Sequence, residues 1–352
     1  MQAANSTRVA VVGATGNLGS SIVAALQNDP QVDSIVAISR REPTGFGDKV
    51  HWRKGDTLKD DLPHLFRDVD CVIHLAWTFH PTHDPVATWR TNVLGSLRVF
   101  DAVAAANVPA LLYASSVAAY SPGPERAIDE SWPTHGWPGA AYPREKAYLE
   151  RCLDVFAEEH PDIRVVRMRT AFCFKAQSAS EQRRIFIGPL LPNSLVRPEL
   201  LPAIPSFPGL QLQALHSDDA AEAYRLAVHS DARGAFNVAA EPVIDAAVLS
   251  ELFGARTVPV PSWPIRGLLA ALWQMRLVPA SPDLFDTFLH LPIMDTTRVR
   301  TELGWSPRYT ATETLEEFLR ALRQGTGGET PPLRPSSSTG RLSEVLTAGT
   351  RV

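Results

Sequence analysis

A short run near the amino terminus reads Val11-Val12-Gly13-Ala14-Thr15-Gly16-Asn17-Leu18-Gly19, and it joins an apolar stretch to a helical pattern. The first glycine permits a tight turn, the second lets a ligand approach the backbone, and the third lets the helix pack closely on the strand. The first amides of the helix are then free to bind an anion at the positive end of the helix dipole. The spacing is GxxGxxG rather than GxGxxG, and in this context it predicts a dinucleotide site whose candidate residues are Gly13, Thr15, Gly16, Asn17, Leu18 and Gly19.

Outward from this turn, apolar β-branched runs alternate with helical periods through the first half of the chain. The predicted strands are 8–12, 34–39, 50–53, 71–75, 110–114 and 163–168, and the predicted helices are 18–27, 85–106 and 143–159. Alternation of this kind is typical of βαβ units, and strands that are apolar throughout suit a sheet covered on both faces. The sequence therefore predicts an α/β fold of the Rossmann type, with a doubly wound parallel sheet.

The second half of the chain is less regular. A proline-rich stretch at 188–209 excludes a long helix there and suits substrate-binding loops. Strand-like patterns at 210–215 and 235–238 and helical patterns at 218–229, 246–253, 265–276 and 312–324 follow. We expect a Rossmann domain over 1–175, a smaller, mostly helical substrate lobe over 176–324 with elements returning to the sheet near 210–240, and a disordered tail over 325–352.

Composition narrows the class of protein and its partners. The chain has 352 residues, 45% of them hydrophobic, and its net charge of −4 comes from scattered residues, which argues against nucleic acid as a partner. No apolar run is long enough to span a membrane, residues 1–7 do not resemble a signal peptide, and we expect no membrane partner. Three cysteines without CxxC spacing, Cys71, Cys152 and Cys173, fit a reducing cytoplasm.

The end of the second predicted strand bears on the choice of cofactor. An acidic residue about 20 positions beyond the glycines binds the ribose hydroxyls of NAD, whereas an arginine accommodates the 2′-phosphate of NADP. Here Ser39 and Arg40 stand in place of a carboxylate, so NADP is slightly favoured over NAD, although an arginine at a strand end is also common as a solvated residue. Asp56, just after the third strand, is placed to meet the adenine edge or simply to form a turn.

Three side chains suggest acid/base chemistry. Tyr142 and Lys146 are one helical turn apart on the same face, and Pro143 is tolerated between them because it falls in the first turn. A nearby cation stabilises a phenolate, so we expect the pKa of Tyr142 to fall toward neutrality. Ser116 ends a strand at the sheet edge where α/β folds bind ligands, and its hydroxyl can contact the oxygen that reacts beside Tyr142.

In this order, the glycine turn, Ser116 and Tyr142-x-x-x-Lys146 resemble the extended short-chain dehydrogenase/reductases, and among them the NAD-dependent epimerase/dehydratase group. The resemblance runs from about Arg8 to Leu322. Further matching motifs are His74-Leu75-Ala76, Asn92-Val93-Leu94-Gly95, Arg167-Met168-Arg169, His216-Ser217-Asp218-Asp219-Ala220, Phe236-Asn237-Val238-Ala239 and Leu303-Gly304-Trp305.

The resemblance implies a role for each matching residue. Tyr142 would be the acid/base, Lys146 would bind the nicotinamide ribose and lower the tyrosine pKa, and Ser116 would orient the substrate. Leu75 and Ala76 would line the cofactor cleft. Asn92 would be a structural partner near the site, Asp218 would lie at the lobe junction, and two long helices would form a homodimer.

The sequence departs from the family pattern at Trp77, where small residues are usual, so an aromatic ring is expected to narrow or flatten the substrate cleft. Arg183, Arg184 and Arg197 are candidate contacts for an anionic group, although their apolar neighbours also suit an apolar ligand. His74, His80 and His83 lack an acidic partner, and we expect no catalytic metal.

The leading hypothesis is an NAD(P)-dependent epimerase or dehydratase that acts on a small molecule, either sugar-like or otherwise hydroxylated. The first alternative is an NADP(H)-dependent reductase or dehydrogenase of an apolar carbonyl or alcohol. The second is a non-catalytic nucleotide-binding protein, which the presence of both Tyr142 and Lys146 disfavours.

Overall fold

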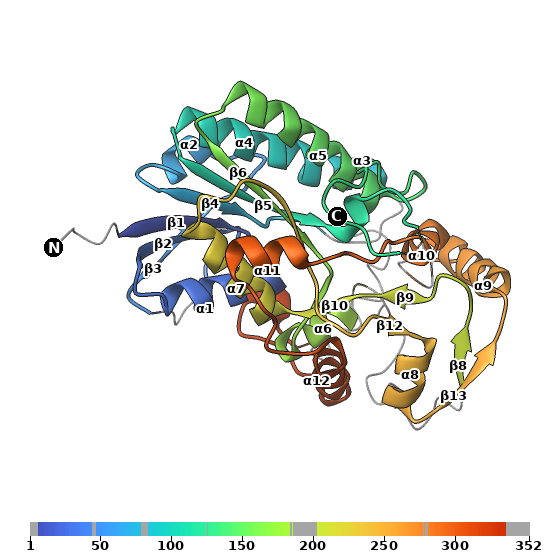
Figure 1. The fold of residues 1–352 in the computed structure, drawn as a ribbon. Coiled ribbons are helices and arrows are strands. Elements are labelled where there is room, and N and C mark those ends of the chain that lie inside the picture. The colour runs from blue at the N-terminus through green and yellow to red at the C-terminus, as the bar shows by residue number, and fades with distance from the viewer. Residues whose placement is uncertain are drawn as a thin grey trace.

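A parallel sheet of seven strands forms the centre of the computed structural model, which describes residues 6–43, 47–78, 84–124, 126–183, 185, 203–276, 278 and 281–335 (Figure 1). The strand order is β11-β6-β5-β4-β1-β2-β3, and each neighbouring pair is parallel. The strands are β1 (Thr7–Val12), β2 (Val32–Ser39), β3 (Val50–Lys54), β4 (Cys71–His74), β5 (Ala110–Ser116), β6 (Arg164–Thr170) and β11 (Gly234–Val238). This topology confirms the predicted doubly wound Rossmann fold.

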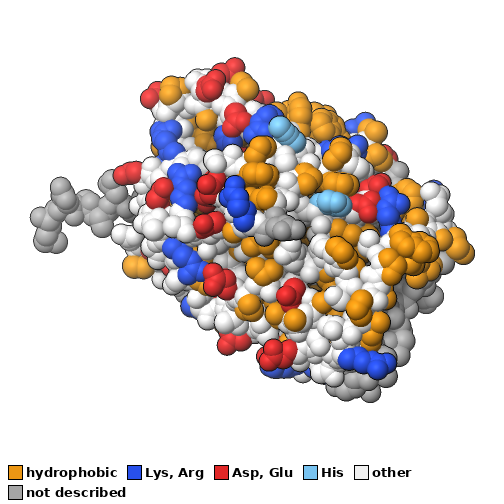
Figure 2. Space-filling view, turned by 45° about the vertical axis from the view of Figure 1, so that its right-hand side comes forward, with side chains coloured by type: hydrophobic (Ala, Val, Ile, Leu, Met, Phe, Trp, Pro, Cys, Tyr) orange, Lys and Arg blue, Asp and Glu red, His pale blue; other side chains and the backbone are white. Residues whose placement is uncertain are grey.

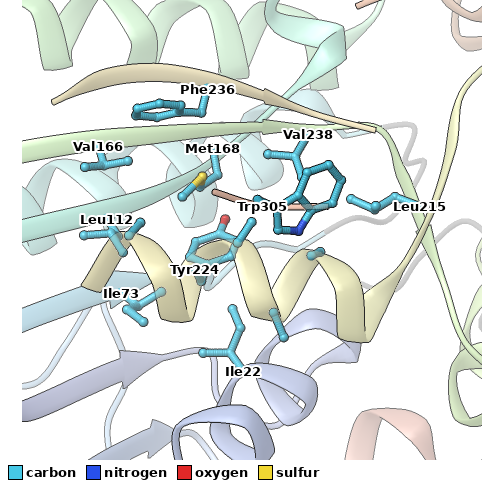
Figure 3. Close-up of a cluster of buried hydrophobic side chains, with 14 of the residues drawn as sticks. Ile22, Ile73, Leu112, Val166, Met168, Leu215, Tyr224, Phe236, Val238 and Trp305 are labelled. Atoms are coloured by element: carbon cyan, nitrogen blue, oxygen red, sulfur yellow. The ribbon is translucent and has the colours of Figure 1, made fainter. Parts of the chain in front are cut away.

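Helices cover both faces of the sheet, as the apolar strands require. One face carries α1 (Asn17–Gln27), α7 (Ser217–Val228) and α11 (Thr297–Leu303), and the other carries α2 (Leu62–Leu65), α4 (Gly95–Ala105) and α5 (Ala141–Glu159) (Figure 1). Between the first group and the sheet lies a core that includes Tyr224 and Trp305 (Figure 3). The indole nitrogen of Trp305 donates to the Asp219 carbonyl oxygen at 2.8 Å, so this large ring is buried without an unpaired polar atom.

The predicted helix at 85–106 is helical throughout but not uniform. It consists of α3 (Pro85–Thr88), a π-helical segment η1 (Trp89–Leu94) and α4. The Ser96 hydroxyl donates to the Asn92 carbonyl oxygen at 2.5 Å, and the Asn92 side chain bonds both backbone groups of Thr78. Segments of π-helix often occur beside functional sites, where they turn a side chain out of the regular helical register.

The substrate lobe contains more strand than predicted. Its helices α8 (Ala246–Phe253), α9 (Ser262–Gln274) and α10 (Pro282–Leu289) accompany two short strand pairs, β8 (Ala203–Ser206) with β13 (Arg256–Pro259), and β9 (Gln211–Leu212) with β12 (Ile244–Asp245). Of the proline-rich stretch, residues 188–202 lie outside the described residues.

One predicted strand, 210–215, is divided in two. Gln213 separates β9 from β10 (Ala214–His216), because its side chain bonds both backbone groups of Met294 at 3.1 and 2.8 Å. Strand β10 then pairs with β7 (Phe172–Phe174) instead of continuing the β9 ladder. Between β7 and the lobe lie η3 (Ala176–Ser178) and α6 (Ala179–Gln182).

The first part of the segment after α12 (Ala311–Gln324) is ordered, whereas a disordered tail over 325–352 is predicted from the sequence. Residues 325–335 pack on the body and include the short helix η7 (Pro331–Leu333), with Leu333 buried. The buried Thr330 hydroxyl donates to the Thr15 carbonyl oxygen at 2.7 Å, and the Ser180 hydroxyl donates to the Thr326 carbonyl oxygen at 2.8 Å. We call residues 325–335 the C-terminal strap; residues 336–352 lie outside the described residues.

None of the helices within the described ranges is long and apolar enough to cross a membrane.

Candidate active site

The glycine turn leaves the start of α1 open. Gly16 is the N-cap, no side chain caps the helix, and the first turn holds no acidic residue. Gly13 has φ +89°, and a Cβ there would lie 2.7 Å from the Ala76 nitrogen, so neither the conformation nor the space suits another residue. A Cβ on Gly19 would overlap the Gly13 carbonyl oxygen, whereas one on Gly16 would meet nothing closer than 3.6 Å. The first and third glycines thus serve packing, and the second leaves room for a ligand.

The other predicted cofactor residues lie along the same carboxyl edge of the sheet. The Leu75 amide donates to the Val12 carbonyl oxygen at 2.8 Å, which places Leu75 and Ala76 beside the glycine turn. Ser39 is buried and its hydroxyl donates to the Arg41 carbonyl oxygen at 2.7 Å, while Arg40 is exposed.

Asp56 adopts the turn-forming arrangement that was one of its two predicted roles. Its side chain accepts a hydrogen bond from the Leu58 amide at 2.9 Å, two residues further along. The adenine contact therefore stays a prediction.

Ser116 and Tyr142 come together at the end of β5. Ser116 is the last residue of that strand, Tyr142 is in the first turn of α5, and their side chains are hydrogen-bonded. Burial raises the pKa of Tyr142 to about 12, and the Ser116 bond opposes this effect. The predicted fall of the tyrosine pKa is therefore wrong, because burial desolvates the phenolate and Lys146 is not among the groups that lower its pKa.

Lys146 is buried one turn beyond Tyr142, but its ammonium points to other groups. Nζ donates to the Ala114 carbonyl oxygen at 2.6 Å, lies 3.6 Å from the centre of the Trp77 ring, and is 5.9 Å from the centre of the Tyr142 ring. Burial lowers the pKa of Lys146 to about 7, although Glu145 and Glu150 act in the opposite direction. The lysine is thus close to changing its protonation state at neutral pH.

The Trp77 ring covers Lys146 and also contacts the Tyr142 ring. Its ring meets the Tyr142 ring edge to face at 5.7 Å between centres, and its indole nitrogen is buried without a hydrogen-bond acceptor among the described residues. The sequence pointed to an aromatic residue that narrows or flattens the cleft. The stacking on Lys146 was not foreseen, because it depends on the path of the loop after β4.

A buried carboxylate lies behind the site. Glu145 accepts hydrogen bonds from the Thr88 hydroxyl at 2.6 Å and the Asn92 amide at 2.8 Å, and burial raises its pKa. The same Asn92 side chain accepts from the Thr78 amide at 2.8 Å. Asn92 therefore ties the loop that carries Trp77 to the helix that carries Lys146, which agrees with the structural role that the resemblance implies.

A second buried network fixes α5 on the sheet. Glu150 bonds the Ser115 hydroxyl at 2.5 Å, Arg167 at 3.1 Å and Arg169 at 2.8 and 3.0 Å. The two guanidinium groups hold the pKa of Glu150 at about 2 although burial alone would raise it. Arg169 continues to the Tyr120 hydroxyl at 2.9 Å. Sequence reasoning included Arg167 and Arg169 only as a family motif, and their alternation along β6 was the signal that both point to one face.

The lobe junction also lies beside the glycine turn. Asp218 accepts a hydrogen bond from the Ser21 hydroxyl at 2.6 Å, and Asn17 donates to the Cys173 carbonyl oxygen at 2.9 Å. Lys175, which sequence reasoning missed, donates to the Ser20 and Ser21 hydroxyls at 2.8 and 2.9 Å, and burial lowers its pKa to about 8. These contacts attach β7 and α7 to the start of α1.

The remaining candidate residues are not brought to the site within the part of the chain that the structure describes. His74 is buried against the Ser96 hydroxyl at 2.9 Å, and burial lowers its pKa to about 3. Arg183 is buried, while Arg184, Arg197, His80 and His83 lie outside the described residues. Within the part of the chain that is described, no three His, Cys, Asp or Glu residues are grouped so that they could hold a metal ion.

A Rossmann sheet with an open glycine turn and a Ser-Tyr-Lys set at one edge defines a class of proteins. Comparison with known proteins shows to which family within that class the chain belongs. The family model described as the NAD dependent epimerase/dehydratase family matches residues 9–239. The chain belongs to this family.

Two curated relatives match at different lengths. An uncharacterized protein of Mycobacterium tuberculosis is 24% identical over 324 residues, which cover 89% of this chain and 83% of the relative. L-arabinose 1-dehydrogenase (NAD(P)(+)) of Haloferax volcanii is 35% identical over 109 residues, which cover 31% of this chain and 41% of the relative.

Solved structures show the same fold. UDP-glucose 4-epimerase of Thermus thermophilus, solved in complex with NAD, has a TM-score of 0.68 at 20% identity, with 90% of this chain and 99% of that chain covered. UDP-N-acetylglucosamine 4-epimerase of Bacillus cereus has a TM-score of 0.64 at 20% identity, with 90% of this chain and 100% of that chain covered.

Proposed function

We propose that this protein is an NAD(P)-dependent epimerase or dehydratase that acts on a hydroxyl-bearing, sugar-like small molecule. The observation that carries the proposal is the hydrogen-bonded pair of Ser116 and Tyr142, with Lys146 one turn further along α5 and the open glycine turn on the same sheet edge. The family membership and the likeness to NAD-bound sugar-nucleotide epimerases support it.

The residues present suit a dinucleotide. The uncapped start of α1 offers backbone amides to a diphosphate, and Gly16 leaves space beside them. Leu75 and Ala76 would line the adjoining cleft, and Lys146 would bind the ribose next to the nicotinamide. A bound nicotinamide would supply a hydride acceptor that later returns the hydride to the substrate.

Tyr142 has to remove a proton from the substrate hydroxyl, and its raised pKa sets a condition for this step. Phenolate forms near neutral pH only when a cation lies close to the phenol oxygen. Lys146 supplies that cation if its ammonium turns from the Trp77 ring toward the phenol, and Ser116 holds the reacting oxygen in line. The ketone produced in this way permits inversion or elimination before the hydride returns.

A second candidate function is an NADP(H)-dependent reductase or dehydrogenase. Its support is the exposed Arg40 beside a buried Ser39, where no carboxylate is present to bind the ribose hydroxyls of NAD. Trp77 adds support, since a large ring over Lys146 gives the cleft an apolar wall.

The first experiment separates these two functions. The purified protein is denatured, any released nucleotide is identified by mass, and the emptied protein is titrated with NAD, NADP and their reduced forms. Tightly held NAD would support the epimerase or dehydratase. An empty site that prefers NADPH would support the reductase.

The second experiment tests the catalytic residues. UDP-glucose and L-arabinose are the first substrates to try, and products are identified by mass and NMR. Tyr142→Phe is expected to bind the cofactor normally and to lose turnover by at least about 100-fold. Tyr148→Phe, which changes an exposed tyrosine of the same helix, is the matched control. Full activity in Tyr142→Phe would refute the assignment.

A further inference from the structure

The start of the C-terminal strap is attached to the body by two helices. Helices α6 and α12 pack together through the buried side chains of Ala179, Ala321 and Leu322 (Figure 1). The strap begins directly after α12, and the Ser180 hydroxyl of α6 donates to the Thr326 carbonyl oxygen at 2.8 Å. These contacts fix the first residues of the strap beside α6.

The rest of the strap folds back on itself and reaches the glycine turn. The Gly328 amide donates to the Leu333 carbonyl oxygen at 2.7 Å, and the Leu333 amide donates to the Thr330 carbonyl oxygen at 2.9 Å. Only 4% of Thr330 is exposed, and a hydroxyl buried to this extent needs a partner. Its partner is the Thr15 carbonyl oxygen at 2.7 Å, so two segments 315 positions apart in the sequence are bonded directly.

The strap covers one part of the glycine turn and leaves the next part open. Thr15 is buried, whereas Gly16, Asn17 and Leu18 are partly exposed. The first amides of α1 belong to this open part, and they have neither an intrahelical acceptor nor a side-chain cap. Figure 2 shows basic and acidic side chains interspersed on one face of the molecule, with no single basic patch there. The amides of the turn are the donors that the site offers to a diphosphate, and the strap does not cover them.

The peptide group between Thr15 and Gly16 is held from both sides. Its carbonyl oxygen accepts from Thr330, and its amide donates to the Gly13 carbonyl oxygen at 3.2 Å. In a trans peptide these two groups point in opposite directions, so the two bonds together oppose rotation of the peptide plane. Gly16 has no Cβ to restrict that rotation. Without the Thr330 hydroxyl, the turn that directs the first amides of α1 is therefore less fixed.

We propose that the strap is a structural part of the dinucleotide site and that Thr330 is a positioning residue. Its hydroxyl holds the glycine turn in the shape that binds the diphosphate of NAD or NADP, and a site ordered in advance binds more tightly. Coupling between two sites is reciprocal, so a nucleotide bound at the turn also stabilises the docked strap. This inference rests on the nucleotide binding that the proposed function requires.

The first test measures nucleotide binding by the full chain with isothermal titration calorimetry, and the probes are NAD and NADP. Thr330→Val keeps the side-chain shape and removes the hydroxyl, and it should weaken binding of the nucleotide that the wild type prefers at least about fivefold. Thr330→Ser keeps the hydroxyl and should restore the affinity of the wild type. Thr301→Val, which changes an exposed threonine of α11, is the matched control and should bind as the wild type does.

Hydrogen exchange of the strap is a readout that a purely structural role of Thr330 would not move. In the wild type, saturating nucleotide should slow exchange of the Gly328 and Leu333 amides at least about fivefold, and in Thr330→Val this slowing should disappear. Circular dichroism shows whether each variant is folded.

Three results would overturn the proposal. The first is equal affinity in the wild type and Thr330→Val, and the second is strap exchange that does not respond to nucleotide in the wild type. The third is tighter binding by Thr330→Val, which would make the strap a competitor of the nucleotide. In all three cases the wild type still binds nucleotide and the proposed function stands. A wild type that binds neither NAD nor NADP would instead refute the proposed function, and this inference with it.

Discussion

Replacing Lys146 with methionine should stabilise the protein relative to the wild type, and this stabilisation should be larger at low pH than at high pH. The folded pKa of Lys146 is about 7 and its ordinary value is 10.5, so the unfolded chain binds this proton more tightly. At about 1.4 kcal/mol per pKa unit, the buried ammonium costs about 5 kcal/mol below pH 7.

The sign of the effect follows from the direction of the pKa change. Because the folded pKa is lowered, the cost is fully present below about pH 7 and disappears as the pH rises through 10.5. Methionine has a similar length and no charge, so the variant lacks this term. Its free energy of unfolding minus that of the wild type should therefore fall by about 4 kcal/mol between about pH 6 and pH 10.

Urea unfolding of both proteins across this pH range measures the effect. Titrating groups that do not interact with Lys146 contribute equally to both proteins and cancel in the difference, whereas Glu145 and His74, whose pKa values the lysine lowers, do not. Lys59→Met, which removes an exposed ammonium, is the matched control. A difference that stays constant with pH for Lys146→Met would show that this lysine is well solvated, and the reasoning from burial would be refuted.

Two further predictions concern the buried networks. Glu150→Gln removes the carboxylate between Arg167 and Arg169 and should lower the free energy of unfolding by about 3–5 kcal/mol, measured in urea. Arg169 then stays buried without the carboxylate that it binds, while Arg167 keeps only its ion pair with Asp154. Thr330→Val keeps the side-chain shape but leaves the Thr15 carbonyl oxygen without its donor. It should cost about 1–3 kcal/mol in thermal unfolding and speed the exchange of the strap amides.

The controls for these two variants come from the same chain. Glu158→Gln changes an exposed carboxylate of α5, and Thr301→Val changes an exposed threonine of α11. Both controls should stay within about 0.5 kcal/mol of the wild type. If Glu150→Gln were as stable as its control, the network would not contribute to stability. Unchanged exchange in Thr330→Val would show that the strap is held by other contacts.

The sheet could be predicted from sequence because its information is local. Apolar β-branched runs separated by helical periods predict the strands. The glycine turn predicts that the first strand continues into a helix that crosses over to a parallel second strand. The order of the glycine turn, Ser116 and Tyr142 along successive βα units also places them on one edge, since the carboxyl ends of parallel strands meet there.

The details of the site could not be predicted, because they depend on contacts between distant segments. The pKa of Tyr142 depends on how fully the ring is desolvated, and the direction of Lys146 depends on where the loop places Trp77. The division of strand 210–215 at Gln213 needs Met294, and the order of the strap needs Thr15. Local periodicity and turn signals cannot indicate Met294 or Thr15 as partners, because both are far away in the sequence from the residues that they bind.

The hydrogen bond between Thr330 and Thr15 has a practical consequence for handling this protein. It brings residue 330 to the carboxyl end of β1, while residue 6 lies at the opposite end of the same strand. A fluorescent label at residue 6 is therefore separated from the glycine turn by the full length of β1. A label introduced in the strap instead lies next to the glycine turn, where a change in its fluorescence on addition of NAD or NADP would test the proposed nucleotide site.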